Sequence, residues 1–274
     1  MKKILITGAN SYIGTSVEAH LVQYPEEYQV KTVDMIGEGW REVSFFGYDS
    51  IFHVAGIAHQ DSRKISEERK QEYYRVNTHL AVETAEKARA EGVPHFIFMS
   101  SIIIYGAVTK LGETKVIDRD TVPAPIGAYG DSKLQAERGL AALQDETFRL
   151  CVLRPPMIYG PGSKGNYRLL EKVALRWPFF PDIKNERSML HIDNLYAYVK
   201  RMIDTQAAGI FFPQDAEYLC TSQMVREIAA ARGRKIRLTK FFNPLLKFLS
   251  GKVRVVDKVF GGLIYDRSME IAEE

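Results

Sequence analysis

A tyrosine and a lysine four residues apart, Tyr129 and Lys133, are the pair in this sequence whose types and spacing best fit chemistry. They fall within a helical pattern expected over residues 129–143, where a spacing of four places both side chains on one face. A lysine ammonium beside a phenol favours the phenolate, so we expect the pKa of Tyr129 to fall from about 10 toward neutrality. Tyr129 is therefore a candidate proton donor and acceptor for a substrate hydroxyl.

Two serines, Ser100 and Ser101, follow an apolar run at 96–99 that is expected to form a buried strand. In open parallel sheets, ligands bind outside the carboxyl ends of the strands. A serine at this place can hydrogen-bond the reacting oxygen. The Tyr-x-x-x-Lys spacing is common by chance, so its position on the helix after this strand is what gives it weight.

The beginning of the chain has the pattern of a phosphate-binding turn between a strand at 4–7 and a helix at 12–23. Gly8 can turn the chain with a positive φ, and Gly14 lets the helix pack close to the strand. A pyrophosphate would lie on the N–H groups of the helix N-terminus. Ser11 stands where such fingerprints usually have a middle glycine. Its side chain must therefore point away from a cofactor or bond a phosphate oxygen through its hydroxyl.

Asp34 follows a second expected strand at 30–33. A carboxylate here accepts hydrogen bonds from ribose hydroxyls and repels a 2′-phosphate. No arginine or lysine follows until Arg41. This pattern favours NAD over NADP as the cofactor. The segment from Asp34 to Ile51 is too short for a full second helix, so no residue is assigned to the adenine.

Short apolar runs alternate with longer helical patterns along the chain. Strands are expected at 4–7, 30–33, 50–54, 96–99 and 149–153, and helices at 12–23, 77–91, 129–143, 194–203 and 222–232. Strands that are apolar on both faces and separated by helices indicate an α/β fold, a doubly wound parallel sheet of the Rossmann type with right-handed crossovers.

Proline and glycine crowd together after Arg154, which indicates that the chain leaves the sheet there. We expect an NAD-binding Rossmann domain at 1–155, with a return segment near 188–206. A smaller C-terminal substrate-binding lobe is expected at 156–187 and 207–274.

The totals limit the classes of function. The chain has 274 residues, 46% of them hydrophobic, and a net charge of only +3, which does not suggest a nucleic-acid partner. The two cysteines, Cys151 and Cys220, have no metal spacing and are expected to be reduced thiols, and no metal is expected. No apolar run is long enough to span a membrane. These features favour a soluble cytoplasmic protein.

Several ordered motifs together resemble the extended short-chain dehydrogenases/reductases, in particular the nucleotide-sugar epimerase/dehydratase family. The resemblance covers nearly the whole chain. It is carried by Thr7–Gly14, FHVAG at 52–56, Val76-Asn77, FMSSIIIYG at 98–106, Tyr129–Lys133, LRPPMIYGPG at 153–162 and RSMLHIDNL at 187–195.

The resemblance implies roles for individual residues. By position, Ser101, Tyr129 and Lys133 match the family's catalytic residues, and Lys133 would also bond the nicotinamide ribose. Together with the turn described above, the expected cofactor-binding set is Gly8, Asn10, Ser11, Tyr12, Ile13, Gly14, Asp34, Val54, Ala55, Gly56, Asn77, Ser100, Tyr129, Lys133 and Pro155. Ser101 and Tyr129 would also contact the substrate. Arg187 matches an arginine that contacts the substrate diphosphate, a role that suits guanidinium charge and geometry.

Departures from the family pattern narrow the chemistry. Family dehydratases carry an Asp-Glu pair just after the catalytic Ser/Thr, where this chain has Ile102 and Ile103. Neither side chain can move a proton, so a 4,6-dehydratase is not expected. Met157 replaces an asparagine that faces the substrate in many members, and we hypothesise that Asn166 takes over that contact. The pattern resembles a bacterial subgroup described as UDP-glucose 4-epimerase-like.

Three functions remain open. The first is NAD-dependent epimerisation, or other hydride transfer, at C4 of a nucleotide sugar, with UDP as the expected carrier. The second is reduction of a 4-keto-sugar nucleotide in surface-polysaccharide synthesis. The third is a non-catalytic NAD-sensing protein of the same fold, although such proteins usually lose the tyrosine or the lysine. The presence of both Tyr129 and Lys133 favours an enzyme.

The stretch from Arg232 to Lys258 is rich in lysine and arginine, which interleave with large apolar residues. One interpretation is an amphipathic segment that contacts a membrane. The other, which we favour from the sequence, is a cap over the substrate lobe. Relatives often dimerise through the Tyr-x-x-x-Lys helix, so a homodimer is a further expectation.

Overall fold

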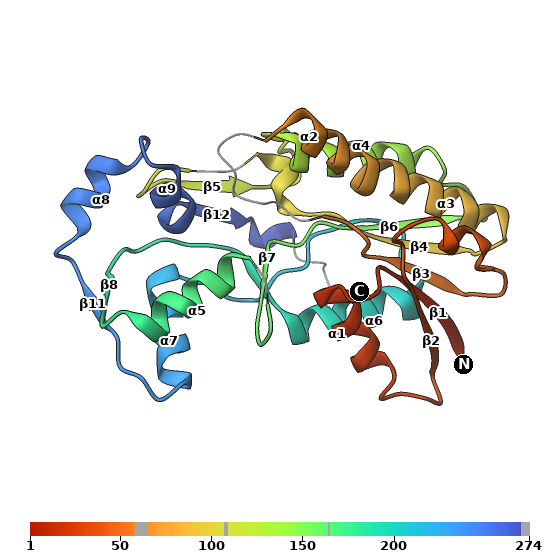
Figure 1. Cartoon of the computed structure of the whole chain (residues 1–274), viewed down its shortest axis with the longest axis horizontal. Coiled ribbons are helices and arrows are strands. Elements are labelled where there is room, and N and C mark those ends of the chain that lie inside the picture. The colour runs from red at the N-terminus through yellow and green to blue at the C-terminus, as the bar shows by residue number, and fades with distance from the viewer. Residues whose placement is uncertain (58–64, 107–108, 164, 270–274) are drawn as a thin grey trace. The chain divides into compact units, whose positions relative to one another are not determined.

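The computed structural model describes residues 1–57, 65–106, 109–163 and 165–269, except for the side chain of Asn166. The chain divides into two compact units. Unit 1 comprises residues 1–106, 123–155 and 192–213, and unit 2 comprises 107–122, 156–191 and 214–274. Figure 1 shows the elements of both units along the chain.

Unit 1 is built from strands that alternate with helices. Its elements are β1 (Lys2–Thr7), α1 (Tyr12–Leu21), β2 (Tyr28–Val33), η1 (Gly39–Glu42), β3 (Ser50–His53), α2 (Glu67–Tyr73), η2 (Tyr74–His79), α3 (Leu80–Ala90), β4 (His95–Met99), η3 (Ile102–Tyr105), α4 (Ala128–Ala141), β6 (Arg149–Leu153), α6 (Ile192–Thr205) and β10 (Gly209–Phe211).

The strands of unit 1 form one six-stranded parallel sheet in the order β10-β6-β4-β3-β1-β2. The chain moves outward from β1 to β2 and then returns past β1 to β3. This reversal creates a topological switch point at the carboxyl ends of β1 and β3, where α/β sheets bind ligands. The fold is the expected doubly wound Rossmann sheet, and β10 adds a strand that the sequence analysis did not identify.

Helices cover both faces of this sheet. Figure 1 shows α2, α3 and α4 on one face and α1 and α6 on the other. Small side chains at helical spacing let α3 pack closely, since Ala81, Ala85 and Ala88 are fully buried in the same cluster as Phe96 and Phe98 of β4. Every residue of β4 is buried. Burial on both faces is the reason for the uninterrupted apolar pattern of this strand.

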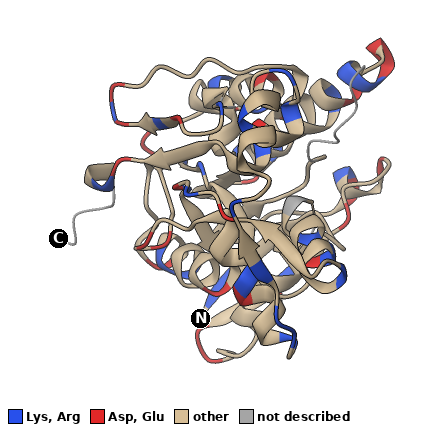
Figure 2. Ribbon diagram, turned by 90° about the vertical axis from the view of Figure 1, so that its left-hand side faces the viewer, with Lys and Arg blue, Asp and Glu red and all other residues tan. Residues whose placement is uncertain are grey.

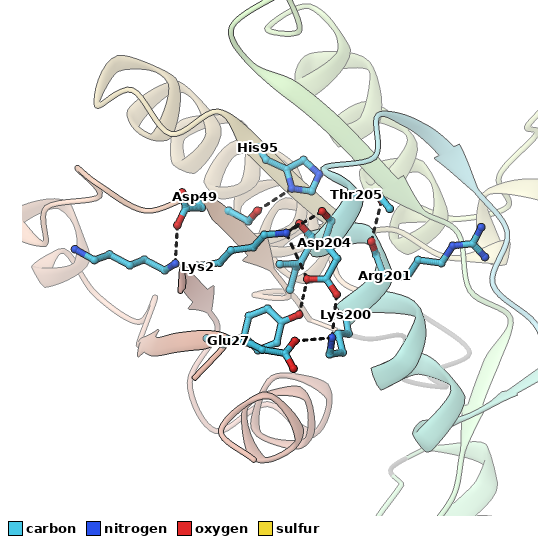
Figure 3. A network of polar contacts seen from close by, with 12 residues as sticks. Lys2, Glu27, Asp49, His95, Lys200, Arg201, Asp204 and Thr205 are labelled. Carbon is cyan, nitrogen blue, oxygen red and sulfur yellow. Dashed lines mark hydrogen bonds and ion pairs between the residues drawn. The ribbon is translucent and has the colours of Figure 1, made fainter. Parts of the chain in front are cut away.

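Polar contacts fasten the end of α6 to the first two strands (Figure 3). The Lys2 ammonium donates to the backbone oxygens of Ile203 and Asp204 at 3.1 and 2.8 Å. The Tyr28 hydroxyl donates to the Asp204 carboxylate, which also pairs with Lys200 at 2.9 Å. These bonds fix α6 against β1 and the edge strand β2.

Unit 2 contains short strands and helices. Its elements are β5 (Thr114–Ile117), β7 (Met157–Tyr159), α5 (Asn166–Arg176), β8 (Phe179–Pro181), β9 (Met189–His191), α7 (Thr221–Ala231), β11 (Arg237–Thr239), α8 (Asn243–Leu249), α9 (Arg254–Phe260), β12 (Gly262–Tyr265) and η4 (Arg267–Met269). The strands of this unit form three separate parallel pairs, β7-β9, β8-β11 and β5-β12. Apolar side chains from α5, α7 and α9 form the core of this unit.

The compact units differ from the expected domain bounds in two places. Residues 107–122, which the sequence analysis assigned to the first domain, belong to unit 2 because β5 pairs with β12. The return segment runs from Ile192 to Pro213 in place of the expected 188–206, because it includes β10 as well as α6.

Charges of both signs are distributed over the helices and loops (Figure 2). Within the described residues, no helix has both the length and the apolar character needed to cross a bilayer.

Candidate active site

A cavity of about 720 Å³ lies at the switch point of the unit 1 sheet. Gly8 and Asp34, which directly follow β1 and β2, and Ala55, the second residue after β3, form part of its wall. The other wall residues are Ala9, Asn10, Ser11, Met35, Ile36, Gly37, Glu38, Trp40, Arg41, Gly56, Ile57, Glu72, Arg75, Val76, His79, Leu80 and Glu83. The size suits a cofactor, since ligand pockets are typically about 300–1,000 Å³.

Gly8 makes the turn after β1, with a φ of +108°. A Cβ at this position would lie 2.8 Å from the backbone nitrogen and 2.9 Å from the Cα of Ala55. Only glycine fits, because both the backbone conformation and the space exclude a side chain. Asn10 also has a positive φ, +62°, which asparagine tolerates better than most residues. The turn therefore presents backbone to the cavity.

Ser11 is the N-cap of α1, and its hydroxyl oxygen accepts a hydrogen bond of 3.0 Å from the Gly14 N–H. Serine is among the preferred residues at an N-cap, and this explains its presence at a place usually taken by glycine. Tyr12 and Ile13 form the first helical positions, next to the turn. The close packing expected of Gly14 is present, since a Cβ would meet Val54 Cγ2 at 3.1 Å.

The carboxylate of Asp34 accepts a hydrogen bond of 3.0 Å from the Ile36 N–H, which orients it after β2. Arg41 also reaches the cavity, but Glu83 and Glu38 both pair with its guanidinium. The two glutamates thus offset the positive charge of Arg41, which disfavours binding of a 2′-phosphate in this part of the cavity. Met35, Ile36 and Leu80 also line the cavity and could not be predicted from the sequence, because they become neighbours only through the turn after β2 and the π-helical turn η2.

Asn77 is fully buried and connects two elements of the site. Its amide bonds both the N–H and the carbonyl of Ile57, at 2.9 and 3.2 Å, and donates to the Ser132 hydroxyl at 3.1 Å. It lies in η2, and π-helical turns are frequent at functional sites. Because these contacts hold the loop after β3 against α4, Asn77 acts here as a positioning residue. Its expected contact with the cofactor stays a prediction.

Gly56 lies between the cavity and α4. It belongs to the cavity wall, and a Cβ there would lie 3.0 Å from Asn77 Oδ1 and 3.4 Å from Lys133 Nζ. A larger residue would separate these side chains from the loop. Val54 anchors the start of this loop, because its N–H donates to the Thr7 carbonyl at 3.1 Å.

Ser101, Tyr129 and Lys133 lie together at the carboxyl end of β4. Ser101 caps η3 by accepting a 3.3 Å hydrogen bond from the Ile103 N–H, and it also hydrogen-bonds Tyr129. The Lys133 ammonium is buried, donates to the Met99 carbonyl at 2.8 Å, and lies 4.8 Å from the centre of the Phe98 ring. The expected catalytic set is thus assembled within unit 1.

Burial determines the protonation of this set. Burial raises the pKa of Tyr129 to about 12, although the Ser101 hydrogen bond lowers it. Burial also lowers the pKa of Lys133 to about 8, against the favourable charge of Glu137. The expectation that Lys133 brings the tyrosine pKa toward neutrality is wrong, because burial raises this pKa and the group that lowers it is Ser101. The phenol therefore carries its proton at neutral pH.

A buried polar network that the sequence analysis missed lies behind the catalytic set. The Ser100 hydroxyl donates to Glu137, and Arg154 pairs with the same carboxylate at 2.6 Å. Arg154 also donates to the Tyr105 hydroxyl at 2.7 Å. The Ser100 hydroxyl is thus bonded inside the protein, and the expected contact of Ser100 with the cofactor stays a prediction. A sequence signal was available, since Glu137 follows Lys133 by one helical turn.

The remaining expected residues fall at the edges of the site or in unit 2. The Pro155 carbonyl, after β6, accepts a 2.9 Å bond from the Ile102 N–H. In unit 2, one terminal nitrogen of Arg187 donates to the carbonyls of Lys258 and Gly261 at 2.7 and 3.3 Å. Burial lowers the pKa of this guanidinium. Asn166 is the first residue of α5, but its side chain lies outside the described part of the structure.

The residues present in unit 1 fit a dinucleotide cofactor. A glycine turn that excludes any side chain lies beside a helix N-terminus, and a carboxylate stands at the end of the second strand. The turn and the helix N-terminus suit the pyrophosphate of such a cofactor, and the carboxylate suits its ribose. Across the described residues, no cluster of His, Cys, Asp and Glu could hold a metal ion.

Comparison with known proteins agrees with this geometry. Residues 4–211 match the NAD dependent epimerase/dehydratase family. A UDP-glucose 4-epimerase from Vibrio cholerae is 31% identical, over 97% of this chain and 88% of its own length. An N-acetyl-alpha-D-glucosaminyl-diphospho-ditrans,octacis-undecaprenol 4-epimerase from Escherichia coli O157:H7 is 26% identical, over 85% of this chain and 73% of its own.

Among solved structures, the dTDP-4-dehydrorhamnose reductase of Bacillus anthracis, determined with NADP, superimposes with a TM-score of 0.70 at 19% identity. The match covers 87% of this chain and 83% of the reductase, and it supports the same fold. The glycine turn, the Tyr-Lys helix and the family match over most of the chain lead to one conclusion: this protein belongs to the NAD-dependent epimerase/dehydratase family.

Proposed function

We propose that this protein is an enzyme that uses NAD to interconvert sugars at C4 of a nucleotide sugar, with UDP as the carrier. The observation that carries the proposal is the position of Gly56, which lines the cofactor-sized cavity and directly neighbours Lys133. Proton transfer at Tyr129 and hydride transfer at the cavity can therefore act on one carbon.

In this proposal, Tyr129 first loses its phenolic proton to water, and the phenolate then takes the proton of the C4 hydroxyl while Ser101 holds the same oxygen through its hydroxyl. Bound NAD supplies the acceptor for the C4 hydride and its donor in the return step. Lys133, cationic at neutral pH, stabilises the phenolate that forms. When the hydride returns to the opposite face of the sugar, Tyr129 gives the proton back to the oxygen and the epimer results.

Elimination of water is not part of the proposed chemistry. Ile102 is buried and Ile103 half-buried at the places where a dehydratase needs an acid and a base.

We also propose that Arg187 contacts the substrate diphosphate, because its Nε and second terminal nitrogen have no partner among the described residues. The free thiols of Cys151 and Cys220 support a cytoplasmic location for the enzyme.

A 4-keto-sugar reductase remains the alternative, since the same tyrosine can protonate the oxygen formed when a ketone is reduced. A first experiment separates the two. The purified protein is denatured and assayed for released NAD(H), and fresh protein is then incubated with UDP-glucose or UDP-GlcNAc without added cofactor.

Bound NAD with C4-epimerised product would support the epimerase. Turnover only after a 4-keto sugar and a reduced cofactor are supplied would identify a reductase. A parallel incubation with N-acetylglucosaminyl diphospho-undecaprenol tests the carrier, since one relative is named for that lipid-linked sugar. Cofactor binding without turnover in any incubation would contradict the enzymatic proposal and favour a non-catalytic NAD sensor.

A further inference from the structure

A short segment of unit 2, residues 240–254, combines exposed apolar side chains with exposed positive charge. We call it the α8 segment, because it contains α8 and the turns on either side. Its sequence, KFFNPLLKFLSGKVR, contains four cations, Lys240, Lys247, Lys252 and Arg254, and no Asp or Glu.

The segment presents apolar groups on two sides. Leu246, Leu249 and Val253 pack, partly buried, against the core of unit 2. No residue of α8 is fully buried, and on the side away from this core Phe241 is 83% exposed, Leu245 57% and Phe248 65%. A surface helix normally places polar residues there, so these three side chains are not explained by the packing of unit 2.

The positive charges of the segment are not neutralised within the described part of the chain. Lys240, Lys247, Lys252 and Arg254 are all exposed and form no ion pair with a described residue. The nearest acid in sequence, Asp257, is buried and accepts bonds from the Ser250 hydroxyl and the Gly251 N–H. The outer surface of the segment is therefore apolar and cationic.

Lys252 shows how the two kinds of group share this surface. Its ammonium lies 3.7 Å from the centre of the Phe248 ring. The aromatic ring and the cation thus occupy the same patch. Side chains of this kind suit a boundary between lipid headgroups and acyl chains, where the stem is buried and the charge stays in water.

We propose that the α8 segment docks onto an anionic lipid surface. Phe241, Leu245 and Phe248 would enter the boundary between headgroups and acyl chains, while the four cations would pair with lipid phosphates. A second copy of the chain is a poorer occupant, because a two-fold contact through this patch would bring like charges together. The proposal concerns where the protein works, and it does not depend on its catalytic activity.

The test is co-sedimentation of the full chain with vesicles of phosphatidylcholine alone or mixed with phosphatidylglycerol. We expect binding only to the mixed vesicles, weakened by added salt because the cations are exposed. Phe241→Ser/Phe248→Ser and Lys247→Glu/Lys252→Glu should each weaken the partitioning by about tenfold or more.

Matched controls change the same kinds of side chain elsewhere. Val22→Ser/Phe46→Ser alters exposed apolar residues of unit 1, and Lys31→Glu/Lys172→Glu makes the same change in net charge on exposed lysines. Both should bind the mixed vesicles as the unaltered chain does. Circular dichroism verifies that every variant is folded.

Three results would overturn the proposal. The first is absence of binding to the mixed vesicles, and the second is an equal loss of vesicle binding in the target and control variants. The third is a dimer, detected by light scattering, that the substitutions in the α8 segment dissociate while the unaltered chain binds no lipid.

Discussion

The guanidinium of Arg154 holds the carboxylate of Glu137 through two nitrogens, with Nε at 3.2 Å and Nη2 at 2.6 Å from Oε2. Both side chains are buried. The pair joins α4, which carries Tyr129 and Lys133, to the end of β6. Since the Ser100 hydroxyl donates to the same carboxylate, the pair also holds the end of β4 beside Ser101.

Removal of one partner should therefore destabilise the fold. Arg154→Met leaves Glu137 buried without its counter-charge, and we expect the free energy of unfolding to fall by about 3–5 kcal/mol. Urea denaturation followed by circular dichroism measures this loss. Arg232→Met, which breaks the exposed 2.8 Å pair with Glu171, should cost less than about 1 kcal/mol. Similar losses in the two variants would contradict a special role for the buried pair.

Tyr129 is expected to carry the proton transfer. Tyr129→Phe should reduce kcat by about 10²–10⁴-fold while NAD binding survives, because only the phenolic oxygen is removed. Tyr74→Phe is the matched control, since the Tyr74 hydroxyl donates to Asp131 on the same helix at 2.7 Å. The control should retain kcat within about threefold. Activity retained in Tyr129→Phe would exclude the proposed proton donor.

The pH dependence of kcat/KM should report Lys133, whose pKa is lowered to about 8 by burial. The lysine is cationic below this pH and neutral above it. Its support for the phenolate is therefore present at neutral pH and lost as the pH rises through about 8, so kcat/KM should fall about tenfold per pH unit beyond it. Lys133→Arg stays charged and should lack this fall. If kcat/KM falls in the same way at high pH in both proteins, the titration belongs to a group other than Lys133.

Gly8 should tolerate no side chain. In Gly8→Ala, the new Cβ would meet the Ala55 backbone at 2.8 Å in a residue with a positive φ. We expect loss of bound NAD and a decrease of about 2 kcal/mol or more in the free energy of unfolding. Gly39→Ala is the control, because a Cβ there meets nothing within 4 Å and its φ lies outside the positive range. NAD content after purification and a urea titration give the two measurements.

Much of unit 1 could be predicted from the sequence because its signals are local. The apolar run at 149–153 became β6 with the same bounds, and the helix expected at 129–143 became Ala128–Ala141. Burial on both sides imposes an apolar pattern that does not depend on distant partners. The turn at Gly8 was recognisable for the same reason, since strand, glycine and helix follow each other directly.

Features that depend on distant residues could not be predicted in this way. The placement of residues 107–122 in unit 2 depends on pairing between β5 and β12, which are far apart in the chain. The spacing of Tyr129 and Lys133 placed them on one helix face, but it did not reveal how far burial would raise the pKa of the phenol. The exposure of Phe241 and Phe248 likewise required the three-dimensional arrangement of unit 2.

The interleaved course of the chain has a consequence for gene fragments and their products. β10, which follows α6, is hydrogen-bonded to β6 and completes that side of the sheet. A polypeptide that stopped at Pro155 would leave β6 as an unprotected edge, with open backbone groups that other chains could pair with. Such a truncated product is therefore expected to aggregate during expression. Only a polypeptide that includes β10 can cover the edge of β6.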